Sequence, residues 1–369
     1  DAAGRDDESG WADLDGARMT GRAAMEAAGI SRIVLGAKEG LALNNGATFS
    51  AALAALAVAD GENLERNAEV ALAMMLEALL GVSAAFHADL HAARRHAGQI
   101  AVAAAIRGLI AGSTFVDAGG RVQDPYSLRC APQVLGPVRE TLARVRAWTE
   151  AEINAATDNP LIFPDMDGPI KAISGGNFHG EVVGMAMDFL GVALAEVGAL
   201  AERQVYRLLS DRHSFGLPPM LVDEAAAGLN SGLMMPHYTT ASLVLENQTL
   251  AHPDTVHSLP TSAGQEDHNA NALTAARHAR QIVANVTHIL AVEFFAVAQA
   301  VDLRARMLPE ARLAPATAAA RACIREAAPF IDGDRLFQAD IRAVEELVRG
   351  GAIVRAVRAQ DDVGLPAGE

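Results

Sequence analysis

The sequence predicts an all-α protein: a large antiparallel helical bundle with a smaller helical layer at its C-terminal end. Hydrophobic residues make up 51% of the 369 residues, whereas aromatic residues make up only 4%. Alanine and leucine dominate, and both favour helix, whereas sheet-rich chains rely on β-branched and aromatic residues. Charged residues at helical intervals recur within these apolar stretches. This pattern is typical of long helices that pack side by side.

The N-terminal part of the chain divides into two regions. Residues 1–34 are expected to form a partly loose remnant, because residues 1–10 are polar and acidic and residues 14–30 predict a turn and a short helix. Residues 35–310 are expected to form the central helical core. Over 41–112 we expect three helices, because turn-forming residues interrupt the pattern three times. The expected breaks are NNG (44–46), ADGEN (59–63) and LLGVS (79–83).

The middle of the chain begins with the sequence VQDPYSLRCAPQ (122–133). Asp124 and Pro125 predict a helix start, because aspartate caps free amides and proline suits the first helical position. Pro132 then interrupts that helix. The next helix is predicted over 136–156, and the turn TDNP (157–160) ends it.

The remaining elements follow from the same signals. The stretch 161–176 is the one that resembles strand or extended loop, and we see no fixed-period repeat. A C-terminal layer is expected over 311–369. Helices are predicted over 177–210, 223–251 and 268–307, with a smaller helical group over 315–358.

Charge and cysteine content narrow the class of protein. The formal charge of −15 argues against a nucleic-acid binder, which needs a basic surface. Cys130 and Cys323 form no metal or disulfide framework, so we expect reduced thiols and a cytoplasmic location. The apolar stretch 182–200 carries Asp188 and Glu196, which favours a buried helix over a membrane span. No metal or nucleotide is predicted.

Polar residues at breaks between helices are the candidate functional residues. Gln123, Tyr126 and Arg129 are spaced three apart, so a helix would place them roughly on one side. An arginine there can bind a carboxylate with two parallel hydrogen bonds, and a tyrosine hydroxyl can donate or accept. The alternative is structural: Arg129 would pair with a nearby acid, and Tyr126 would cover the core.

Three further breaks carry candidates with equally plain alternatives. Asn45 precedes a glycine, where a turn or cap residue is expected. Phe178 and His179 follow a double glycine, where a packed aromatic and a helix start would account for them. Glu266 and Asp267 precede a long helix, whose N-terminus favours acids. Each signal alone is weak.

Taken together and in order, these segments resemble the aromatic amino-acid ammonia-lyase family, and within it the histidine ammonia-lyases. The helical lyases related to fumarase and aspartase carry a different, serine-rich loop. The stretch SGLMMPHYTT (231–240) resembles that loop only superficially. The matching strings are LGAKEGLALNNG (35–46), VQDPYSLRCAPQVLG (122–136), NAATDNPLIF (154–163), SGGNFHGE (174–181), GLNSG (228–232) and LENQTLAHPDTVHSLPTSAGQEDH (245–268).

The resemblance implies an enzyme that eliminates ammonia from an α-amino acid and leaves an α,β-unsaturated acid. Acid–base residues alone contribute about 10²–10⁴-fold, too little for so poor a leaving group. In this family a methylidene-imidazolone, formed autocatalytically from Ala-Ser-Gly, supplies the electrophile.

The same resemblance implies a role for six residues. Arg129 corresponds to the substrate-carboxylate clamp, and Gln123 and Phe178 correspond to further pocket residues. Tyr126 corresponds to the tyrosine that shapes the prosthetic-group pocket and assists the chemistry. Asn45 corresponds to the asparagine that supports the prosthetic group and the substrate carboxylate. Glu266 is expected near the amino group or imidazole of the substrate, where it holds a cation or takes a proton.

No Ala-Ser-Gly occurs in the 369 residues. Three interpretations follow: the chain is the C-terminal part of a longer enzyme, one subunit of a split enzyme, or a non-catalytic relative. The retained arginine and QEDH strings favour the first two. We therefore expect a partner segment or companion chain that carries the triad, an amino-acid substrate and, by resemblance, a tetramer whose sites combine several subunits.

Smaller departures from the family pattern bear on the substrate. Gly264 stands where asparagine is usual, and Asn269 and Ala270 stand where valine and serine are usual. His237 and Tyr238 lie in a stretch that is normally plainer. The QEDH string favours histidine or a close analogue. Activity on phenylalanine or tyrosine, an aminomutase activity and a non-catalytic structural subunit remain the alternatives.

Overall fold

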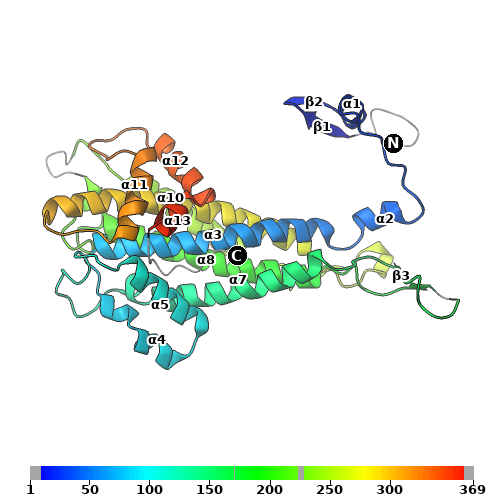
Figure 1. The fold of residues 1–369 in the computed structure, drawn as a ribbon, viewed down its shortest axis with the longest axis horizontal. Coiled ribbons are helices and arrows are strands. Elements are labelled where there is room, and N and C mark those ends of the chain that lie inside the picture. The colour runs from blue at the N-terminus through cyan, green and yellow to red at the C-terminus, as the bar shows by residue number, and fades with distance from the viewer. Residues whose placement is uncertain (1–9, 170, 223–227, 361–369) are drawn as a thin grey trace. The chain divides into compact units, whose positions relative to one another are not determined.

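The computed structural model describes residues 10–169, 171–222 and 228–360. Most of these residues are helical, which confirms the predicted fold class (Figure 1). The chain divides into two compact units. Residues 1–48 and 157–178 form the first, and residues 49–156 and 179–369 form the second.

Long helices form the core of the second unit. The elements are α3 (Thr48–Ala78), α5 (Ala97–Leu109), α7 (Ala131–Ile153), α8 (Glu181–Leu209), α9 (Met234–Leu250) and α10 (Ala272–Met307). Ion pairs link these helices: Arg139 of α7 reaches both Glu65 and Glu69 of α3 at 2.8 Å. Of these helices α10 is the most central, because an unbroken run from Ile289 to Arg304 is buried.

Helix α3 corrects one predicted break. The breaks near 44–46 and 79–83 are confirmed, but the helix runs without interruption through 59–63. Gly61 serves helix packing here and does not break the helix: a Cβ atom at this position would lie 3.0 Å from Leu142 and 3.4 Å from Leu190. The glycine therefore permits close packing of α3 on α7 and α8, and tertiary contacts outweigh its poor helix propensity.

The segment around Pro132 also differs from the prediction. The helix α6 is a single turn, Tyr126–Arg129, and α7 already begins at Ala131. Pro132 therefore lies in the first turn of α7, where its missing amide has no intrahelical acceptor to lose. Asp124 does not cap α6. Its buried carboxylate accepts from the Val82 amide at 2.6 Å and from Arg121.

Short elements connect the long helices. Between α3 and α5 lie η2 (Ser83–Phe86) and α4 (Ala88–Arg94), and η3 (Pro219–Leu221) follows α8. The helix predicted over 223–251 begins at Met234, and residues 223–227 lie outside the described residues. The 3₁₀ turn η5 (Ser262–Gly264) lies in the connection between α9 and α10.

The smaller helical group over 315–358 is present. It comprises α11 (Pro315–Ala327), α12 (Gln338–Arg349) and α13 (Ala352–Arg358). Asp302 of α10 forms ion pairs with Arg321 and Arg325 of α11. A carboxylate that is 9% exposed needs such partners, so the ion pairs fasten this group to the core helix.

The described part of the first unit contains two small hairpins and two helices. Strands β1 (Trp11–Leu14) and β2 (Ala17–Thr20) pair antiparallel with Trp11 opposite Thr20, and α1 (Gly21–Ala27) follows. Sequence analysis predicted only a turn and a helix here. Asp15 and Gly16 both have positive φ, the Asp-Gly hairpin signal that went unused. Helix α2 (Glu39–Asn44) and strands β3 (Leu161–Ile162) and β4 (Ala172–Ile173) complete the unit.

Among the described residues, three helical stretches are long and apolar enough to cross a membrane by length and composition: 39–78, 181–209 and 272–307. In α8 and α10, however, 61% and 83% of the apolar window is buried inside the protein. Asp188, which argued against a membrane span, is buried and accepts three hydrogen bonds. The apolar residues of α8 and α10 thus serve mainly the protein core.

Candidate active site

Asn45 lies at the C-terminal end of α2 and is held by an acid. Its amide nitrogen donates to Oδ1 of Asp158 at 2.8 Å, and Lys38 Nζ lies 2.5 Å from Oδ2 of the same carboxylate. The Lys38 hydrogen bond, then those from Asn45 and the Asn159 amide, lower the pKa of Asp158 to about 2. The carboxylate therefore stays ionised and orients the Asn45 side-chain amide. The Oδ1 atom of Asn45 accepts no hydrogen bond from another described residue.

Three sequence motifs meet around that carboxylate in the first unit. Gly46, with φ +76°, approaches Thr157 so closely that a Cβ atom would lie 2.5 Å from the Thr157 carbonyl oxygen. The Asn159 side chain accepts from the Ser174 hydroxyl at 3.0 Å and from the Gly175 amide at 2.8 Å. The strings around 45, 158 and 175 are thus one local structure.

Tyr126 and Arg129 lie together on α6 in the second unit. Leu128 is fully buried, and Gln204 of α8 donates to the Ser127 carbonyl at 2.8 Å, so α6 is fixed to α8. Tyr126 is 72% exposed, and the Arg129 guanidinium lies 4.8 Å from the centre of its ring. Gln123 is exposed and precedes the helix, so it does not share a helical face with the other two.

Arg129 has no acidic partner among the described residues. Its Nε is buried and makes no hydrogen bond there. The structural alternative required an ion pair with a nearby acid, and the described part of the chain contains none for this side chain. A guanidinium fixed beside an exposed tyrosine, with donors unused, is suited to a carboxylate ligand.

Glu266 lies in a folded connection between α9 and α10. Its Oε2 accepts from the Thr261 hydroxyl at 2.6 Å, and its backbone pairs with Thr261. Oε1 makes no hydrogen bond to another described residue. Close by, His179 Nε2 lies 2.9 Å from the His268 carbonyl oxygen, and the two rings stack at 6.0 Å. Phe178, in the first unit, is 37% exposed.

Contacts along α8 show how far apart the two parts of the second unit lie. The connection carrying Glu266 touches α8 at Gly184 and Asp188, whereas α6 touches α8 at Gln204. Sixteen residues separate Asp188 from Gln204, which is about 24 Å along a helix. The two points of attachment on α8 are therefore farther apart than the length of a single amino acid.

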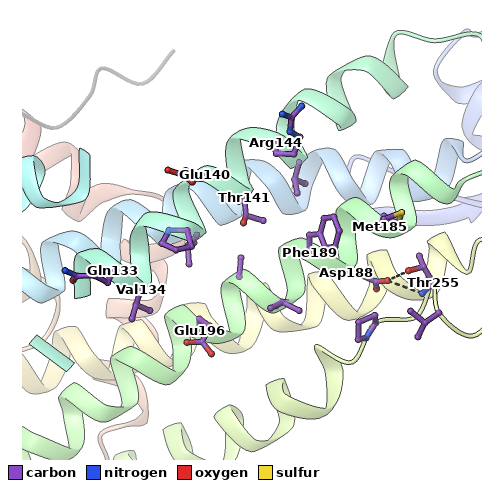
Figure 2. Close-up of a pocket in the computed structure, with 17 residues that line it drawn as sticks. Gln133, Val134, Glu140, Thr141, Arg144, Met185, Asp188, Phe189, Glu196 and Thr255 are labelled. Atoms are coloured by element: carbon purple, nitrogen blue, oxygen red, sulfur yellow. Dashed lines mark hydrogen bonds between the residues drawn. The ribbon is translucent and has the colours of Figure 1, made fainter. Parts of the chain in front are cut away.

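A groove with a volume of about 920 Å³ runs between α7, α8 and residues 253–256 (Figure 2). Its lining is mainly apolar and includes Met185, Phe189 and Val192, but none of the six predicted site residues. No cluster of three or more histidine, cysteine, aspartate or glutamate residues in the described chain could hold a metal ion.

Comparison with known proteins decides the family. The model of the aromatic amino acid lyases matches residues 8–326. The chain belongs to this family. This lyase is 47% identical over 352 residues to the histidine ammonia-lyase of Symbiobacterium thermophilum, a match that covers 95% of the chain and 68% of the relative. The predicted family and the predicted class, a carbon–nitrogen lyase with ammonia-lyase function, are confirmed.

Solved structures agree with the fold of the lyase. The histidine ammonia-lyase of Trypanosoma cruzi superimposes with a TM-score of 0.87 at 38% identity, covering 96% of this chain and 67% of that one. The tyrosine aminomutase of Streptomyces globisporus gives 0.88 at 36% identity, with 96% and 70% covered. Lyases and aminomutases therefore share this fold.

Sequence reasoning missed the residues that hold the candidates in place. Asp158 and Lys38 were not singled out, because TDNP was interpreted only as a turn and Lys38 only as part of a motif. Thr261 was likewise part of a turn-rich connection. Each of these is a polar residue inside a recognised motif to which the sequence assigned no role, and that was the available signal. Only the fold shows which candidate residue each one contacts.

Proposed function

We propose that the chain is the major part of an ammonia-lyase that acts on histidine or a close analogue and releases ammonia to leave an α,β-unsaturated acid. The observation that carries the proposal is the Arg129 guanidinium beside the exposed Tyr126, because its buried Nε has no hydrogen-bond partner among the described residues. The QEDH string and the relatedness to histidine ammonia-lyases support histidine as the substrate.

The residues present fit the prosthetic group that the family implies. A methylidene-imidazolone, formed from an Ala-Ser-Gly segment outside this chain, supplies an electrophile when present. Asn45 would support it, because its Nδ2 donates a hydrogen bond to Asp158 and its Oδ1 stays available. Tyr126 would line its pocket with an exposed hydroxyl.

Substrate orientation falls to the charged residues. Arg129 binds the substrate carboxylate with two parallel hydrogen bonds, and Gln123 and Phe178 line the pocket. Glu266 lies near the amino group or the imidazole and holds a cation or accepts the proton that leaves carbon. The Cα–N and Cβ–H bonds break, a C=C bond forms, and ammonia departs.

We further propose that the site combines residues from several copies of the chain, as in a tetramer. The separation of about 24 Å between the points where α6 and the connection carrying Glu266 attach to α8 supports this, because it favours Arg129 and Glu266 of different chains meeting at one substrate. Exposed apolar side chains of α8, including Phe189 and Val192, give such copies a surface to bury. A cytoplasmic location completes the proposal.

The test uses the complete enzyme, including the segment that carries Ala-Ser-Gly. Incubation with histidine should produce the ultraviolet absorbance of a urocanate-like product. Product from phenylalanine or tyrosine alone would overturn the substrate but keep the reaction class. An amino group moved to the β-carbon would indicate an aminomutase, and no reaction with any amino acid would overturn the class.

The alternative, a non-catalytic structural subunit, is distinguished by mass analysis of the native protein. A companion chain or segment with Ala-Ser-Gly, lighter by two waters, supports the enzyme. An assembly of this chain alone supports the structural subunit.

A further inference from the structure

The connection between α9 and α10 holds Glu266 through one hydroxyl group. The Thr261 Oγ1 to Glu266 Oε2 distance of 2.6 Å is that of a hydrogen bond from a hydroxyl to an ionised carboxylate. Because a hydroxyl has a single hydrogen, Thr261 must accept, not donate, in its other contact. The bond uses Oε2 and leaves Oε1 without a hydrogen-bond partner among the described residues.

Asn269 supplies that other contact. Its Nδ2 lies 3.2 Å from Thr261 Oγ1 and also donates to the carbonyl oxygens of Leu259 and Glu266. Two carbonyl acceptors show that the nitrogen end of the amide points this way, so Asn269 is the donor to Thr261. Its two hydrogens serve three acceptors, so one hydrogen is shared between two of them. The hydrogen bonds therefore run in one direction, from Asn269 to Thr261 to Glu266.

The backbone keeps these three residues in register. The consecutive residues Ser262, Ala263 and Gly264 have positive φ. This left-handed turn reverses the chain so that Glu266 pairs with the backbone of Thr261. The backbone N–H of Asn269 donates to Ser258 Oγ at 2.7 Å. Non-glycine residues at positive φ cost free energy, so surrounding contacts must stabilise this turn.

The base of the connection is fastened to the core. Figure 2 shows Asp188 of α8 reaching Thr255. The buried carboxylate accepts from the Asp254 amide, the Thr255 amide and the Thr255 hydroxyl. At Gly184, one turn earlier, a Cβ atom would lie 2.9 Å from the Ala270 carbonyl oxygen. Both ends of the connection thus contact adjacent turns of α8.

We infer that Thr261, itself held by Asn269, is a positioning residue that fixes the Glu266 carboxylate toward the substrate. The inference rests on the role proposed for Glu266.

The experiment compares Thr261→Val with Thr261→Ser in the complete enzyme, with histidine as the substrate. Valine keeps the shape and removes the hydroxyl, whereas serine keeps the hydroxyl. A hydrogen bond to a charged group is strong enough that its loss should lower activity by on the order of 10-fold. The loss should fall on the same constant, kcat or KM, that Glu266→Gln changes, and Thr261→Ser should restore most of it.

A double variant separates positioning from a merely structural role. If Thr261 acts through Glu266, then Thr261→Val in the Glu266→Gln background should cause little further loss. Thr239→Val is the matched control, because that exposed hydroxyl bonds only within its own helix at Met235; it should leave kinetics unchanged. Asn269→Val, which should also lower activity, replaces Thr261→Val if that variant does not fold.

The outcomes of the two proposals are distinct. If Glu266→Gln leaves activity unchanged, the role proposed for Glu266 is wrong, and the inference fails with it. If Glu266→Gln lowers activity but Thr261→Val behaves like Thr261→Ser, only the inference is wrong. Additive losses in the double variant would also overturn it.

Discussion

At the scale of single residues, hydrogen-bond partners distinguish a binding residue from a structural one. Asn45 and Arg129 are both polar residues at helix breaks, and both had plain structural alternatives. Asn45 donates a hydrogen bond from Nδ2 to Asp158, and its Oδ1 stays available. Arg129 has a buried Nε with no partner among the described residues. Buried donors are rarely left unused, so Arg129 is the stronger candidate for ligand binding.

Replacement of Arg129 by lysine should keep the fold and impair catalysis. A point charge cannot reproduce two parallel hydrogen bonds, so kcat/KM for histidine should fall by about 10–100-fold. Steady-state kinetics of the complete enzyme measure this, and Arg212→Lys on the exposed surface is the control. Unchanged kinetics would show that Arg129 does not bind the carboxylate.

At the scale of helices, glycine marks close packing rather than interruption. Gly61 allows α3 to pass close to α7 and α8, and Gly98 and Gly136 bring α5 against α7. A Cβ on Gly136 would lie 2.5 Å from the Gln99 backbone nitrogen, and one on Gly98 would lie 2.3 Å from the Gly136 carbonyl oxygen. Such contacts with backbone cannot be relieved by turning a side chain.

Gly136→Ala should therefore destabilise the protein, although alanine is the better helix former. Helix propensity favours alanine by about 1 kcal/mol. Overpacking against backbone costs about 1–3 kcal/mol or more, so the net change is a lower Tm. Thermal unfolding followed by circular dichroism measures it. Gly191→Ala is the matched control, because its new methyl group meets only the end of the Ile282 side chain at 3.3 Å; an equal loss there would contradict the packing argument.

At the scale of the whole molecule, buried acids make stability depend on pH. Glu77 of α3 accepts from the Ala314 amide at 2.8 Å, where the C-terminal helical group meets the core. Burial raises its pKa to about 7, despite hydrogen bonds from Thr317, Ala314 and Ser113 that lower it. Burial likewise raises the pKa of the fully buried Glu293 well above its usual range. Both carboxyl groups favour the protonated form.

Stability should therefore fall as pH rises from about 4.5 to 7. Over that range unfolded Glu77 releases its proton while the folded protein retains it, so the favourable contribution is full below pH 4.5 and lost above pH 7. The loss amounts to about 3 kcal/mol. Glu77→Gln should remove the contribution of Glu77 to this slope and exceed the native protein in Tm at pH 8. An identical pH profile for both proteins would contradict the burial argument.

The sequence by itself determined the fold class, most helices and the identity of the candidate site residues. Helical periodicity and motif order are local properties, so they can be recognised without tertiary contacts. The tertiary structure decided which residues hold those candidates. Asn45 and Asp158 are 113 residues apart in the chain, and Asp188 is 66 residues from Asp254, whose backbone amide donates to it. It also decided that Gly61 does not interrupt α3 and that α6 and the connection carrying Glu266 attach to α8 about 24 Å apart, because packing and distance depend on the whole fold.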